Sequence, residues 1–70
     1  MEQVAERLIA GAVETVKKHG ITPRRALQYY RTQAMTSWEP EDVEIVRWYD
    51  RQEEADLQLL AQEVGRRLKS

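Results

Sequence analysis

The sequence contains no cysteine, and its 70 residues include one histidine, three glycines and two prolines. Disulfide bonds are therefore excluded, and the single histidine, His19, cannot form a zinc site alone. A chain this short buries only about 60% of the surface that its unfolded form exposes, and small domains usually need a disulfide, a metal or a partner. We therefore expect self-association, with no bound metal or other cofactor.

Residues for catalysis and for membrane insertion are also scarce. A nucleophile needs a neighbouring base, and the only two serines are Ser37 and Ser70, with one histidine at an expected helix end. The three glycines are too scattered to form a phosphate-binding loop. No hydrophobic run is long enough to span a bilayer. We therefore expect a non-enzymatic, cytoplasmic protein that does not associate with membranes.

Acidic residues are absent from the middle of the chain. Residues 15–38 contain five basic residues and no acidic one, whereas residues 39–56 contain eight acidic residues and two basic ones. Such asymmetry is typical of a nucleic-acid surface, or of two segments that pair with each other.

Apolar periodicity predicts two helices in the first half of the chain. Apolar residues recur at helical spacing over about residues 2–19, and Gly20 follows as a C-terminal cap. Thr22 at the N-cap and Pro23 at the first helical position predict a second helix over about residues 23–35.

The second half of the chain lacks helix breakers. Neither glycine nor proline occurs between Pro40 and Gly65, which predicts one continuous helix over about residues 39–68, about 45 Å long. The expected fold is a single all-α domain of residues 1–70, with three helices. The two shorter helices pack on the first half of the long third helix.

The C-terminal half of this third helix would project beyond the other two with an apolar stripe at heptad-like spacing. Leaving such a stripe in water costs roughly 1.5–3 kcal/mol for each large side chain. We expect the stripe to pair with a second copy of the chain. The alternative is a break near Gln52 that folds the tail back onto residues 2–19 as a fourth helix. The predicted interface consists of Trp38, Leu57, Leu60, Ala61, Val64 and Leu68. Trp38 is included because it lies in the connection before the third helix, where few neighbours can bury it, and tryptophan is common at interface hot spots.

Arg24 and Arg25 occupy the first turn of the second helix, where the helix dipole disfavours positive charge. An anion should therefore lie nearby. In an antiparallel hairpin of the second and third helices, Arg24 lies level with about Gln52. The arginines would then face the acids of residues 50–54 and pair with them inside the chain.

The alternative anion is DNA phosphate. Residues 15–29 resemble a helix-turn-helix, and the run G-I-T-P-R-R-A-L-Q-Y-Y at residues 20–30 looks like the MerR-type motif, in which a similar turn precedes a leucine and paired tyrosines. The resemblance implies a small dimeric DNA-binding regulator. Its DNA-contacting residues, on an outward helix face, would be Arg24, Arg25, Gln28 and Arg31.

The interpretation that we favour is a non-catalytic, small helical protein–protein interaction module, such as an accessory subunit, adaptor or inhibitor. It self-associates through its C-terminal helix and binds another protein. The DNA-binding regulator is the alternative.

Overall fold

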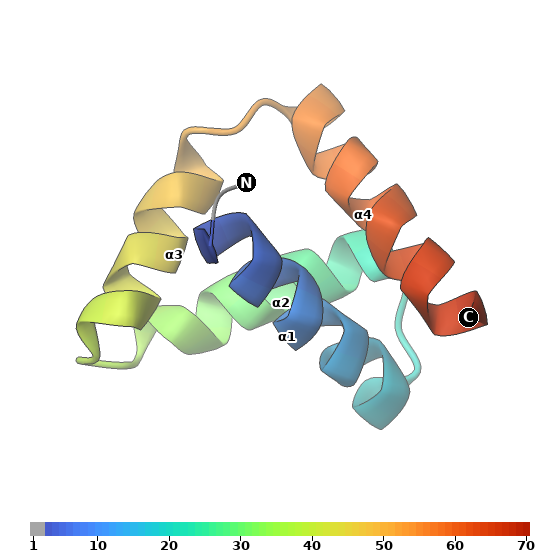
Figure 1. The fold of residues 1–70 in the computed structure, drawn as a ribbon. Helices are drawn as coiled ribbons and strands as arrows, with labels where there is room; N and C mark the ends of the chain where they lie inside the picture. The colour runs from blue at the N-terminus through green and yellow to red at the C-terminus, as the bar shows by residue number, and fades with distance from the viewer. Residues whose placement is uncertain (1–2) are drawn as a thin grey trace.

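The computed structural model describes residues 3–70, which fold into four helices (Figure 1). These are α1 (Gln3–His19), α2 (Pro23–Met35), α3 (Pro40–Asp50) and α4 (Glu54–Lys69). The all-α class is confirmed, but the prediction of three helices is wrong, because the expected third helix divides into α3 and α4. The predicted start of the first helix, at residue 2, lies outside the described residues.

α1 and α2 form the centre of the molecule. α3 and α4 lie at opposite ends of this central pair, and each packs against both α1 and α2 (Figure 1). The longest dimension of the Cα trace is 31 Å, which is shorter than one straight helix of about 30 residues would be. Instead of projecting as a tail, α4 folds back onto the other helices.

The turn between α3 and α4 closes without glycine. Arg51 keeps a right-handed backbone (φ −85°, ψ −9°), and its N–H donates to the carbonyl of Trp48. The Gln52 N–H donates to the carbonyl of Tyr49 at 3.0 Å, and the Gln52 side-chain amide donates to the carbonyl of Trp48 at 2.9 Å. Glu53 is extended and is the N-cap residue of α4. Because no residue in this turn needs positive φ, the absence of glycine does not prevent the break.

The angular positions of the buried residues around the helix axis explain why the chain breaks here. α3 buries Ile45 and Tyr49, and α4 buries Leu57, Ala61 and Val64. At about 100° per residue, a continuous helix would place the second set about 110° around its axis from the first. One straight helix could not turn both sets toward the same pair of helices. A break at residues 51–53 allows both sets to be buried.

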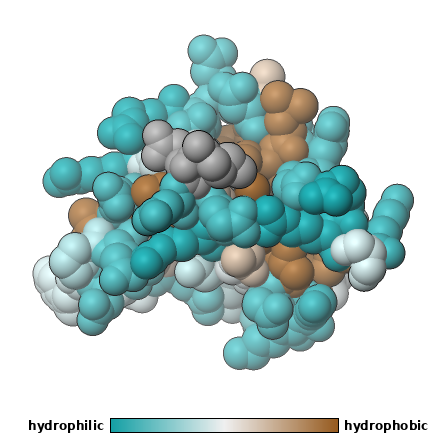
Figure 2. All heavy atoms as spheres, in the orientation of Figure 1, coloured by the Kyte–Doolittle hydropathy of each residue, from teal (hydrophilic) through white to brown (hydrophobic). Residues whose placement is uncertain are grey.

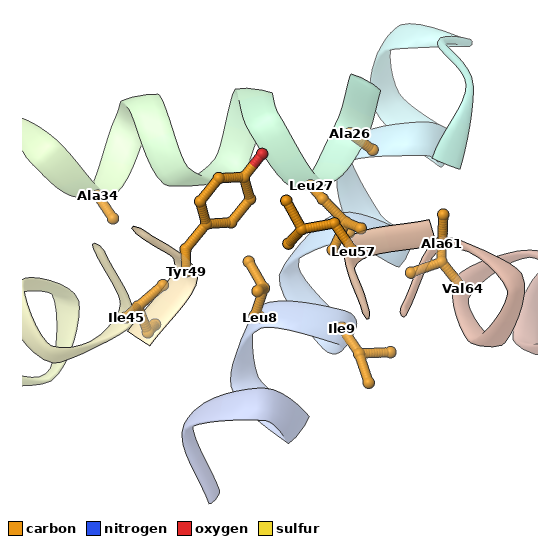
Figure 3. Close-up of a cluster of buried hydrophobic side chains, with 11 residues drawn as sticks. Leu8, Ile9, Ala26, Leu27, Ala34, Ile45, Tyr49, Leu57, Ala61 and Val64 are labelled. Carbon is orange, nitrogen blue, oxygen red and sulfur yellow. The ribbon is translucent and has the colours of Figure 1, made fainter. Parts of the chain in front are cut away.

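Each helix contributes to the core one large side chain that is less than 2% exposed, and other buried side chains, such as Ile9, Tyr49 and Leu57, pack with them (Figure 3). The four least exposed are Leu8, Leu27, Ile45 and Val64. Because Val64 comes from α4, the C-terminal helix is part of the same core as the other three.

Two glycines have specific structural roles. Gly20 has φ +67° and ends α1 as the sequence predicts. Gly11 lies under the ring of Tyr30, and a Cβ atom at Gly11 would come within 2.4 Å of that ring. Gly11 therefore allows α1 and α2 to approach closely.

Candidate functional site

Three residues of the predicted self-association stripe lie in the core of the chain itself. Leu57, Ala61 and Val64 are buried, while Leu60 and Leu68 are half-buried and pack against the same core. Because α4 folds back onto α1 and α2, this stripe is covered by the chain's own helices. Self-association through these residues stays a prediction, but no free stripe supports it.

Arginine–carboxylate pairs cross four of the interfaces between helices. They link α1 to α3, α1 to α4, α2 to α4 and α2 to α3. The four pairs are Arg7–Glu41, Glu6–Arg67, Arg24–Glu54 and Arg31–Asp50. Surface ion pairs typically contribute only about 0–1 kcal/mol each, so their main effect is to fix how the helices are oriented.

The anion beside Arg24 is a carboxylate of the same chain. The Nε and Nη2 atoms of Arg24 both donate to Glu54 at 2.9 Å, and Nη1 donates to the Tyr49 hydroxyl at 2.8 Å. These bonds hold the pKa of Glu54 at about 2, below its ordinary 4.5. Arg31 donates to Asp50 at 2.8 and 2.9 Å and lowers the pKa of that carboxyl. The guanidinium groups of Arg24 and Arg31 lie 5.8 and 5.7 Å from the centre of the Tyr49 ring. The internal pairing is therefore confirmed for Arg24, but it is wrong for Arg25, which makes no ion pair within residues 3–70.

Of the four residues that the DNA-binding alternative requires, two are paired within the chain and two are exposed. Arg24 and Arg31 face α3 and α4, and each side chain is only 25% exposed. Their predicted outward orientation is therefore wrong. Arg25 and Gln28 are exposed, and Arg25 makes no ion pair with any residue from 3 to 70. The face predicted to contact DNA thus keeps one unpaired arginine.

Trp38 lies in the turn between α2 and α3, and its side chain points into solvent. The turn is ordered on both sides of the tryptophan: the Ser37 N–H donates to the carbonyl of Ala34, and the Ser37 hydroxyl accepts from the Glu39 N–H, each at 3.1 Å. Pro40 then occupies the first position of α3. Trp38 is 96% exposed, so a well-ordered turn holds the largest apolar side chain of the loop in water.

Two more exposed apolar residues lie in the helices that flank this turn. Met35 at the end of α2 is 56% exposed, and Val43 in α3 is 40% exposed. The face seen in Figure 2 is mostly hydrophilic, with hydrophobic residues in small patches. We call the surface of Met35, Trp38 and Val43 the Trp38 corner.

A hollow of about 250 Å³ lies between the end of α2 and the outer side of α3, and Ser37, the residue before Trp38, is part of its lining. We call it the corner hollow. It is lined by Ala34, Met35, Ser37, Val43, Val46 and Arg47. Four of these six residues are apolar, and the other two are Ser37 and Arg47.

The sequence interpretation did not single out Met35 or Val43. A signal for Val43 was present: it lies about 160° around the helix from the buried Ile45. Helical phase therefore places Val43 away from the core. No comparable signal marked Met35, because its exposure depends on where α3 begins.

A larger and more polar hollow, of about 580 Å³, lies between α1, α2 and α3. It is lined by residues such as Glu14, Lys18 and His19, and most of its lining is exposed to solvent. Among residues 3–70, no three histidine or carboxylate side chains are grouped to hold a metal ion. No helix in this part of the chain is long and apolar enough to cross a membrane. We assign no function to this hollow.

No family model, curated protein or solved structure matches this chain. Its function must therefore be inferred from the surfaces described above.

Proposed function

We propose that this protein is a non-catalytic protein–protein interaction module, and that the Trp38 corner is its contact surface. The observation that carries the proposal is the 96% exposure of Trp38 on an ordered turn. An aromatic side chain buries about 150–250 Å², so covering Trp38 would contribute about 4–6 kcal/mol of hydrophobic free energy as an upper estimate. Tryptophan is also among the residues that dominate interface hot spots.

The ordered turn supports the same conclusion. Hydrogen bonds on both sides of Trp38 fix the backbone before any partner arrives, so binding would cost little loop-ordering entropy. An accessory subunit, an adaptor or an inhibitor would each use such a preformed surface.

The test is retention of a binding partner by immobilised protein from an extract of the source cells. Trp38→Ala is compared with the unchanged chain and with Leu59→Ala, because Leu59 is also apolar and 60% exposed but lies on α4. We expect one protein to be retained by the unchanged chain and by Leu59→Ala, and lost with Trp38→Ala. Equal retention by all three, or retention of nothing, would contradict the proposal. Both substitutions are at exposed sites, so we expect the helical circular dichroism signal to be unchanged.

The exposed Arg25 and Gln28 keep DNA binding as a second candidate. Contacts with phosphate weaken as salt rises, so the candidate predicts binding to random duplex DNA at low salt that Arg25→Glu abolishes. Absence of such binding, or equal binding by Arg25→Glu, would exclude this face as a DNA-binding site.

A further inference from the structure

The Trp38 corner holds a protruding indole ring and an apolar hollow side by side. Ser37 lines the hollow and directly precedes Trp38 in the chain. The exposed ring is therefore attached one residue away from the lining of the hollow. Trp38 does not fill the hollow of its own chain, because the ring is 96% exposed.

The chemistry of the corner hollow suits an indole ring. Ala34, Val43 and Val46 supply an apolar lining. Met35 also lines the hollow, and its sulfur accepts a hydrogen bond from Arg31 at 2.9 Å; methionine contacts aromatic rings favourably. Arg47 also lines the hollow, and a guanidinium that moves over an aromatic face is attracted to it, most strongly for tryptophan.

Charge on the outer side of α3 adds a second indication. Glu39 stands at the start of α3 and Arg47 in its last turn. Neither makes an ion pair within residues 3–70, although most arginines of the chain are paired. If two α3 helices cross antiparallel about an axis near Val43, Glu39 of each helix approaches Arg47 of the other.

We propose that the Trp38 corner joins two copies of this chain about a two-fold axis, with Trp38 of each copy in the corner hollow of the other. A two-fold contact uses the same patch on both copies, so it requires a surface that is complementary to itself. The Trp38 corner meets this requirement, because it carries the ring, the hollow, the acid and the base together. The inference rests on the proposed function, and it identifies the partner of the Trp38 corner as a second copy of the chain.

The size of the surface sets the strength of the contact. Two tryptophans bury about 300–500 Å² between them, and Met35 and Val43 of both copies add to this area. The total remains near or below the roughly 1,000 Å² of a stable interface. We therefore expect a reversible dimer with a dissociation constant between about 1 µM and about 1 mM.

The experiment measures the mass of the purified full chain by sedimentation equilibrium at total concentrations from about 10 µM to about 1 mM, which spans this range. The mass of the unchanged chain should rise from that of a monomer toward that of a dimer. Trp38→Ala should weaken association at least tenfold, by the usual cost of a hot spot. Leu59→Ala, the matched control on α4, should associate like the unchanged chain.

Charge reversal tests the two-fold arrangement itself. Glu39→Arg and Arg47→Glu should each weaken association, because they bring like charges together across the axis. The double variant restores opposite charges and should recover most of the association. Circular dichroism on each variant shows whether the helices are kept.

Three results would overturn the inference. The unchanged chain could remain a monomer at every concentration, Trp38→Ala could associate as strongly as the unchanged chain, or the double charge variant could remain as weak as the single ones. The proposed function fails separately, since it predicts Trp38-dependent retention of a partner. If the chain is a monomer and a different protein is retained through Trp38, the second copy is excluded as occupant but the interaction surface stands.

Discussion

Replacing Leu57 with alanine tests whether α4 is docked on α1 and α2. Leu57 is 5% exposed, whereas Leu59, two residues further along α4, is 60% exposed. Because a buried leucine leaves a cavity when truncated, Leu57→Ala should lower the free energy of unfolding by about 2–5 kcal/mol. Leu59→Ala should change it by about 0.5 kcal/mol or less. A domain of this size has a total stability of about 4–10 kcal/mol, so the first change removes a large share of it.

The assay is urea unfolding followed by far-ultraviolet circular dichroism, at two protein concentrations. In the docked fold, Leu57→Ala lowers the midpoint by the same amount at both concentrations, because the lost contacts lie within one chain. If α4 instead paired between copies, the loss would depend on concentration. Equal effects of Leu57→Ala and Leu59→Ala would refute the docking of α4.

Gly11→Ala should destabilise the protein only while Tyr30 is present. A Cβ atom would come within 2.4 Å of the Tyr30 ring, and the overpacking cost of about 1–3 kcal/mol exceeds the roughly 0.5–1 kcal/mol gained by removing a helical glycine. In a Tyr30→Ala background, Gly11→Ala should instead be stabilising. Urea unfolding of the unchanged chain, the two single variants and the double variant measures this reversal. Destabilisation by Gly11→Ala in both backgrounds would contradict the close approach of Gly11 to Tyr30. Stability should also fall in acid. Arginine hydrogen bonds hold the pKa values of Glu54 and Glu63 at about 2, below their ordinary 4.5. The two ionised carboxylates therefore stabilise the fold above about pH 4.5, and this contribution is lost as the pH falls toward 2. The melting temperature should drop across this range. A melting temperature that stays constant would contradict these ion pairs.

The sequence was informative where local chemistry decides the structure. Gly20 ends α1 with positive φ, and Thr22 caps α2 by accepting from the Arg25 N–H, as the sequence indicates. The acids expected to pair with Arg24 lie at residues 50–54, and Glu54 is its partner. Trp38 is exposed because it lies in a short turn, which the sequence also indicated. Its role as a partner anchor stays a prediction.

The break between α3 and α4 was only the alternative in the sequence analysis, because local signals do not favour it. Residues 51–53 contain no glycine or proline, and Glu53 makes no side-chain capping bond. What favours the break is burial: Ile45 and Val64 can enter one core only if the helix direction changes between them. The phase difference between the two apolar sets was readable in the sequence. This difference indicates a break only once both apolar sets are known to pack against the same two helices, α1 and α2.

The sequence by itself therefore determined the helical class, the first two helices with their caps, and the presence of an unburied tryptophan in a turn. These features depend on contacts between residues close in the chain. The tertiary structure decided where α4 lies, that Arg24 and Arg31 face inward, and that Met35 and Val43 join Trp38 in one surface. Each of these depends on which helix faces are covered by other helices, and that follows from burying all four apolar faces together.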